Sequence, residues 1–125
     1  MATTYKIRYK NHATPQEQHS AGDRWYLDSD VGKKLTGNGS LAPAAIGTFT
    51  NNVAITTSPT QVGTNKDFVF IKNKGDNDLL ITLDNSNYLI VISKGEAFAS
   101  EVNTSADVRV KASSGSTIVE YYTAT

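Results

Sequence analysis

Hydrophobic and polar residues alternate along most of the second half of the chain, from Asp67 to Tyr122. The side chains of successive residues in a strand point to opposite faces, so this alternation indicates strands. The pattern predicts strands over residues 68–71, 79–83, 88–92, 97–99, 108–111 and 118–122. Gly75, Gly95 and Gly115 lie in turns between them. Short strands separated by regular turns predict an all-β fold, an antiparallel β-sandwich of the Ig-like or jelly-roll-like type.

Three of these strands are apolar on both faces, over residues 68–71, 79–83 and 88–92. By contrast, Val108 and Val110 alternate with charged residues, which predicts one buried and one solvated face. We therefore expect a cover over the second face of the three apolar strands. Either the N-terminal half of the chain or another subunit could supply it.

The first 48 residues have a different character. Tyr5–Lys10 alternates strictly and predicts a strand, whose cationic face is either a protected sheet edge or a contact for an acidic partner. Residues 28–45 are rich in glycine and predict an irregular arm. Strand character resumes at Phe49 and ends at Pro59, and a polar turn follows over 61–66. We expect one domain, with a strand and irregular arm over 1–48 and the sandwich core over 49–125.

Trp25 and Tyr26 form the most aromatic point of the N-terminal half. Such a pair can plug one end of a core, anchor a protein interface or stack on a sugar. If the first 48 residues form an arm across a neighbouring subunit, large and cationic residues of this segment are the candidate contacts. These candidate interface residues are Lys6, Arg8, Lys10, Trp25, Tyr26, Leu27, Leu35 and Leu41.

Composition narrows the range of functions that the chain could have. The 125 residues include 12 basic and 12 acidic residues, and a net charge of zero argues against a nucleic-acid partner. Without cysteine the chain has no disulfide and no thiolate metal site. It also lacks a secretory signal and an apolar run of about 18 residues, so we expect a protein made in a cytoplasm and not inserted in a membrane.

The search for catalytic residues predicts that the chain is not an enzyme. Its serines lie in turns without a nucleophile elbow, and both histidines fall in one early loop. Asp76 and Asp78 lack the surrounding pattern of a calcium loop. The one cluster with metal-ligand chemistry has no recognised spacing, so we predict no metal and no cofactor. Its members are His12, Glu17, His19 and Asp23.

The last half of the chain resembles the small β-sandwich virion proteins of tailed bacteriophages. The resemblance lies in Phe68–Gly75, Leu79–Asp84, Ile90–Phe98, Val108–Ala112 and Thr117–Tyr122. That group includes capsid decoration (cement) proteins and small head or tail components. The resemblance implies a structural protein located in the virion, most of all a capsid decoration protein. It also implies a homo-oligomer with the major capsid or tail protein as its partner.

A carbohydrate- or receptor-binding module is the alternative from another functional class. Such a module needs an aromatic platform with amide or carboxylate groups nearby. Trp25, Tyr26, Asn85, Asn87 and Tyr88 would supply one if the fold brings them together.

Overall fold

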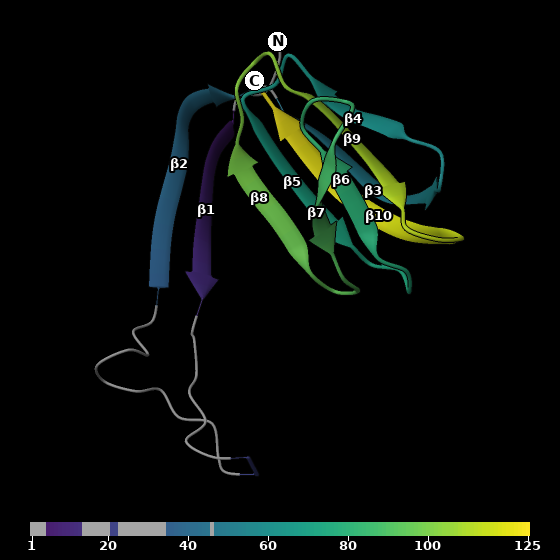
Figure 1. Ribbon diagram of the computed structural model, residues 1–125. Coiled ribbons are helices and arrows are strands. Elements are labelled where there is room, and N and C mark those ends of the chain that lie inside the picture. Colours follow the sequence, from purple (N-terminus) through teal and green to yellow (C-terminus); the bar gives the residue numbers. More distant parts are fainter. Residues whose placement is uncertain (1–4, 14–20, 23–34, 46) are drawn as a thin grey trace. The chain divides into compact units, whose positions relative to one another are not determined.

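The computed structural model describes residues 5–13, 21–22, 35–45 and 47–125. The chain forms two compact units, one over residues 7–41 and the other made of residues 1–6 and 42–125. Figure 1 shows the strands of both.

Two strands, β1 (Tyr5–Ala13) and β2 (Leu35–Ala45), form a two-stranded sheet. β1 confirms the strand predicted at Tyr5–Lys10. β2 corrects the irregular arm predicted for 28–45, because residues 35–45 pair with β1. Each strand of a two-stranded sheet is an edge, where Pro43 is tolerated, and pairing outweighs the low strand propensity of glycine. The rest of the predicted arm, residues 28–34, lies outside the described residues.

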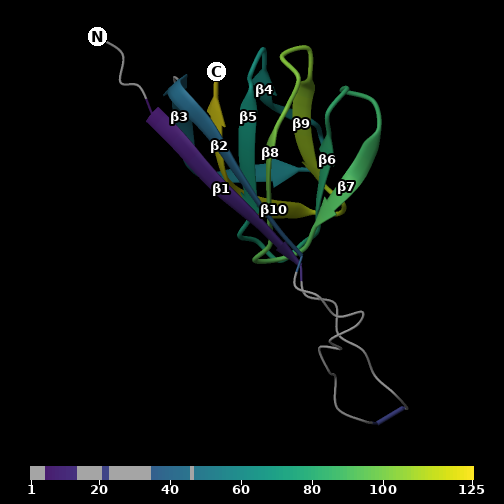
Figure 2. The same cartoon turned by 90° about the vertical axis from the view of Figure 1, so that its left-hand side faces the viewer.

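The remaining strands form two four-stranded antiparallel sheets that pack face to face (Figures 1 and 2). One sheet has the order β3-β10-β5-β8 and the other has the order β4-β9-β6-β7. The strands are β3 (Gly47–Thr56), β4 (Thr60–Thr64), β5 (Phe68–Asn73), β6 (Leu79–Thr82), β7 (Tyr88–Ile92), β8 (Ala97–Glu101), β9 (Asp107–Ala112) and β10 (Ser116–Ala124). The predicted antiparallel β-sandwich is therefore confirmed. The described residues contain no helix that could cross a membrane.

Every strand predicted from Phe49 onward is present, and one strand was missed. β4 occupies Thr60–Thr64, where the sequence predicted a polar turn. Only Val62 of this run packs into the hydrophobic core, so the segment shows no apolar alternation. β4 is an edge strand with a register irregularity between Gln61 and Gly63, and the polar composition fits a sheet edge.

The core lies between the two sheets. Val108 and Val110 of β9 are fully buried while Arg109 and Lys111 are partly exposed, so the predicted alternation of this strand is confirmed. The buried cluster consists of Ile55, Val62, Val69, Ile71, Leu79, Ile81, Ile92, Val108, Val110 and Val119. All of these residues belong to the two four-stranded sheets.

A buried asparagine ties one end of the sandwich together. The side-chain Nδ2 of Asn73, at the end of β5, donates to the carbonyl oxygens of Asn77 (2.8 Å) and Ile92 (2.9 Å). Its Oδ1 accepts from the Thr117 hydroxyl (2.6 Å) and the Gly75 amide (3.2 Å). The fully buried amide thereby links β5 to β7, β10 and the β5–β6 turn, with its polar atoms satisfied.

Candidate interaction surface

Strand β7 forms one edge of its sheet and pairs only with β6. Ile81 lies opposite Ile90, but the next residue of β6, Thr82, lies opposite Tyr88. Leu89 is therefore the extra residue of a β-bulge. The simple alternation in the sequence placed Tyr88 on the same face as Ile90 and Ile92. The bulge corrects this, because it moves Tyr88 into register with Thr82, on the opposite face from Ile81.

A small cluster covers the outer face of this sheet near its edge. Leu80 of β6 lies between Val91 of β7 and Lys111 of β9. The Lys111 Nζ lies 4.2 Å from the centroid of the Tyr88 ring, a cation–π contact. This contact requires Tyr88 to share the outer face with Lys111, in agreement with the register. One side of the Tyr88 ring is thus already occupied.

The edge itself exposes large apolar side chains. Leu89 is 84% exposed and Val91 is 56% exposed. Beside Leu89, a cavity of about 300 Å³ is lined by Ile81, Leu83, Asp84, Asn87, Leu89 and Ile90. The sequence left two covers open for the second face of strand 88–92. Leu89 and Val91 stay exposed in the part of the chain that the structure describes, and both covers stay predictions.

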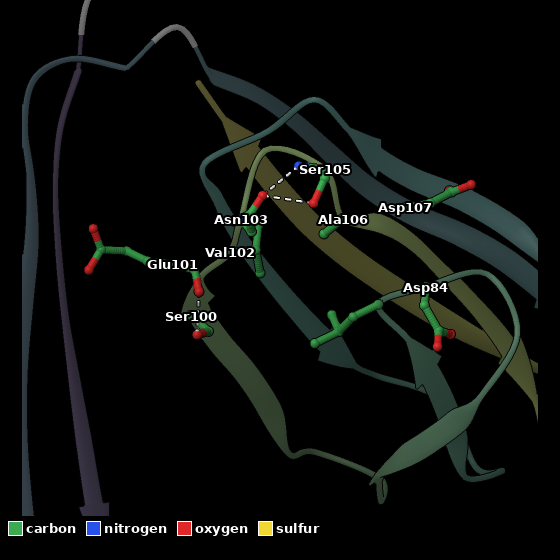
Figure 3. A pocket seen from close by; sticks show the side chains of 9 residues that line it. Asp84, Ser100, Glu101, Val102, Asn103, Ser105, Ala106 and Asp107 are labelled. Atoms are coloured by element: carbon green, nitrogen blue, oxygen red, sulfur yellow. Dashed lines mark hydrogen bonds between the residues drawn. The ribbon is translucent and has the colours of Figure 1, made fainter.

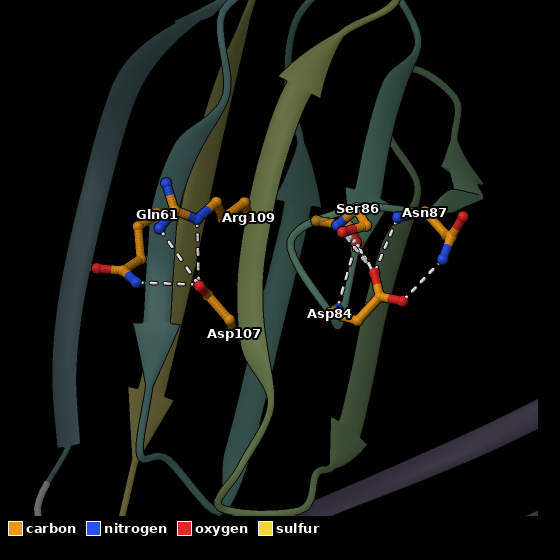
Figure 4. A network of polar contacts seen from close by, with 7 residues as sticks. Gln61, Asp84, Ser86, Asn87, Asp107 and Arg109 are labelled. Carbon is orange, nitrogen blue, oxygen red and sulfur yellow. Dashed lines mark hydrogen bonds and ion pairs between the residues drawn. The ribbon is translucent and has the colours of Figure 1, made fainter.

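The turn before β7 is ordered by one carboxylate (Figure 4). Asp84 Oδ1 accepts from the Asn87 amide (2.8 Å), the Ser86 amide (2.9 Å) and the Thr82 hydroxyl (2.8 Å). Its Oδ2 accepts from the Asn87 Nδ2 (2.9 Å). These donors, with those of Asn87 the strongest, lower the pKa of Asp84 far below its usual range. Asn85 adopts a positive φ of 59°, a conformation that asparagine tolerates better than most residues.

A second, larger cavity of about 530 Å³ lies beside the β8–β9 turn (Figure 3). Leu83 and Asp84, which also border the first cavity, are part of its lining. The other lining residues are Ser100, Glu101, Val102, Asn103, Ser105, Ala106 and Asp107. Asn103 Oδ1 accepts from the amide (2.9 Å) and the hydroxyl (2.8 Å) of Ser105. The polar side chains of this turn therefore hold the turn itself.

Asp107, at the end of this lining, belongs to a further network (Figure 4). Its Oδ1 accepts from Arg109 Nε (3.1 Å) and Gln61 Nε2 (2.9 Å). Hydrogen bonding by Arg109, then by Gln61, lowers the pKa of Asp107. Asp84 and Asp107 are therefore held as anions near neutral pH.

The structure does not bring the residues singled out in the sequence into one described site. Trp25, Tyr26 and Leu27 lie outside the described residues. Lys6 and Arg8 belong to β1, and Leu35 and Leu41 belong to β2. Lys10, also on β1, is exposed. These interface assignments stay predictions.

Of the residues predicted as metal ligands or as a sugar platform, some likewise lie outside the described residues. Glu17, His19 and Asp23 lie outside the described residues, and His12 belongs to β1. The described part of the chain contains no group of three potential metal ligands. Within the proposed sugar platform, the Asn87 side chain is bonded to Asp84 and Tyr88 lies against Lys111.

Sequence reasoning missed Leu89 and Val91 as surface residues. Their signal was present, because the strand 88–92 is apolar on both faces. The bulge and the edge position that expose them follow from strand pairing, which the sequence does not display.

The fold places the chain in the class of all-β, two-sheet sandwich proteins. Comparisons with protein-family models, curated proteins and solved structures gave no match.

Proposed function

We propose that this protein is a non-enzymatic structural protein of a tailed-bacteriophage virion, and that it decorates and stabilises the capsid. The observation that carries the proposal is the apolar edge of β7, where Leu89 and Val91 are exposed and Leu89 borders a cavity of about 300 Å³. Large apolar side chains that are exposed together on a sheet edge favour a contact with another macromolecule. The resemblance of the last half of the chain to small virion proteins is the reason for proposing a virion as the assembly.

The polar groups around this edge support binding by shape and apolar contact. Asp84 is saturated by donors of its own turn, and the side chain of Asn87 is bonded to it. The carboxylate of Asp107 is likewise engaged, by Arg109 and Gln61. On this proposal the major capsid protein, or a tail protein for a small head or tail component, is the partner.

The carbohydrate-binding alternative receives less support. A sugar platform needs an open aromatic face, and Lys111 covers one side of the Tyr88 ring. Binding of a soluble glycan with a change in Trp25 fluorescence would favour that alternative over the virion role.

The proposal is tested on density-banded particles of the phage that encodes the chain. Quantitative mass spectrometry should find the protein in intact particles at a fixed ratio to the major capsid protein. Particles that lack the protein should assemble but lose their DNA at a lower temperature. Absence from banded particles, or unchanged heat resistance without the protein, would contradict the decoration role.

Purified variants added back to particles that lack the protein test whether the β7 edge makes the contact. We expect Val91→Lys to fail to restore heat resistance, because it places a charge on the contact edge. Phe49→Lys is the matched control, since Phe49 is equally exposed (56%) but lies on β3 of the other sheet. Equal rescue by both variants would remove β7 from the contact.

A further inference from the structure

Strand β10 lies inside its sheet, although both of its neighbours precede it in the sequence. It pairs with β3 from Ser116 to Ala124 on one side, and with β5 from Val119 to Ala124 on the other. β3 is an edge strand, and β10 is its only neighbour in the sheet. Without β10, a gap one strand wide would therefore separate β3 from β5, and β3 would have no partner in its sheet.

The side chains of β10 alternate between the core and the outer face of the sheet. Thr117, Val119 and Thr123 are at most 3% exposed, and Tyr121 packs against the buried cluster. Ile118, which lies between two of the buried residues, is 38% exposed. When a strand adds to a sheet, main-chain hydrogen bonds give affinity and alternate side chains give specificity. β10 has both features.

Polar groups on either side of β5 also bind β10. The Asp67 amide, just before β5, donates to the carbonyl oxygen of Ala124 (2.8 Å). The Lys74 amide, just after β5, donates to the carbonyl oxygen of Ile118 (2.7 Å). The buried side chain of Asn73 accepts a hydrogen bond from a β10 hydroxyl, as described above. The gap therefore offers β10 polar partners near both of its ends.

We propose that β10 is the closing strand of the sandwich, and that the gap between β3 and β5 accepts it even when it is not covalently joined to the rest. The pairs β4–β9, β9–β6, β6–β7 and β5–β8 do not include β10. The pair β3–β10 joins the two strands of the sandwich that lie furthest apart in the sequence. Pairing over long sequence distances is slow, so β10 inserts after local pairs such as β6–β7 have formed.

A full-length chain with a specific protease site inserted between Ser114 and Gly115 tests the proposal. Both residues are exposed in the turn between β9 and β10, where insertions are tolerated. After cleavage of the folded protein, we expect the short fragment to co-elute with the large one. The fragments are then separated in urea and mixed again without urea. The mixture should regain the β circular-dichroism spectrum and a single thermal transition, which the large fragment alone should lack.

Two results would overturn the proposal. One is a large fragment that keeps the thermal transition without the strand. The other is a pair of fragments that stays unfolded after mixing.

Substitutions in the short fragment test which face is recognised. Val119→Thr should weaken recombination about tenfold, because it places a hydroxyl at a fully buried apolar position. Ile118→Thr is the matched control, since it makes the same kind of change at the exposed neighbour and keeps a branched Cβ. Its effect should be about threefold or less. Equal effects of the two substitutions would refute recognition through the inward face.

Pulse-labelled hydrogen exchange during refolding of the unaltered chain is an independent measurement, and it decides the question if the inserted site prevents folding. The amides of β6 and β7 should become protected first. Those of β3 and β10 should follow together, because β3 has no other partner in its sheet. Protection of β3 or β10 ahead of β6 and β7 would overturn the closing role. Both experiments use the purified protein alone, so their outcome is independent of the virion role.

Discussion

At the scale of single residues, the sandwich depends on a few positions whose surroundings allow little change. Asn73 is fully buried and uses its side chain for four hydrogen bonds, which join separate strands at one end of the core. Gly75 lies in the same turn, with a backbone that passes directly against Thr117 and Ile118. The sequence pattern predicted Gly75 only as a turn residue.

Asn73→Ala should lower the free energy of unfolding by about 3 kcal/mol. The loss arises because the substitution leaves buried polar groups on β7, β10 and the β5–β6 turn without partners. Urea unfolding of the variant and the wild type measures the difference. The exposed Asn51 provides the control, and Asn51→Ala should change stability by no more than about 0.5 kcal/mol. Similar losses for both variants would refute the linking role of Asn73.

Gly75→Ala should destabilise the protein more than Gly95→Ala. A Cβ at residue 75 would collide with the Thr117 hydroxyl, so we expect a loss above about 2 kcal/mol. At Gly95 a Cβ meets no atom within 4 Å, but φ is +82°, so the cost is conformational and about 1 kcal/mol. Thermal and urea unfolding of the two variants rank them. The reverse order would show that turn conformation, rather than close packing, explains Gly75.

At the scale of the elements, the sequence predicted a strand well where alternating or continuous apolar residues mark it. It predicted a strand poorly where only pairing with a neighbouring strand identifies it. β9 shows its buried valines directly in its alternation. β4 offered only Val62 as a core residue, and β2 carries glycine and Pro43, so neither has an apolar period. The bulge at Leu89 was also invisible, because it is defined by what lies opposite on β6. The sequence showed that strand 88–92 is apolar on both faces, but not that this strand lies at the edge of its sheet.

The turn between β6 and β7 gives a prediction about pH. The folded state lowers the pKa of Asp84, so the unfolded chain binds more protons than the folded chain in acid. The stabilisation is therefore present above the unfolded pKa, about 4, and is lost as pH falls toward the lower folded value. Asp84→Asn should be less stable than the wild type at pH 7, and the difference should shrink near pH 2.5. Urea midpoints at both pH values measure this, and a constant difference would contradict the assignment.

At the scale of the whole molecule, the described core belongs entirely to the two four-stranded sheets. Among the residues whose side chains the structure describes, the buried cluster runs from Ile55 to Val119. The contacts predicted in the N-terminal half, Trp25 above all, and the contact edge proposed at β7 belong to different parts of the chain. The sequence predicted the contact at the aromatic pair, Trp25 and Tyr26. Strand pairing and the exposure of side chains instead favour β7.

A chain reduced to residues 42–125 should keep a cooperative fold, because it retains all eight strands of the sandwich and the buried cluster. Circular dichroism should show a β spectrum and a single thermal transition. An unfolded product would mean that the first 41 residues are required for the core.

The proposal that β7 is the edge by which this protein contacts its assembly partner is checked by hydrogen–deuterium exchange on the full-length protein, free in solution and added back to particles that lack it. β4 and β7 are both five-residue edges of one sheet, so β4 serves as an internal reference. We predict that the amides of β7 and its bulge exchange more slowly on the particles while those of β4 do not change. Equal exchange of β7 in the two states, or protection of β4 instead, would refute β7 as the contact edge.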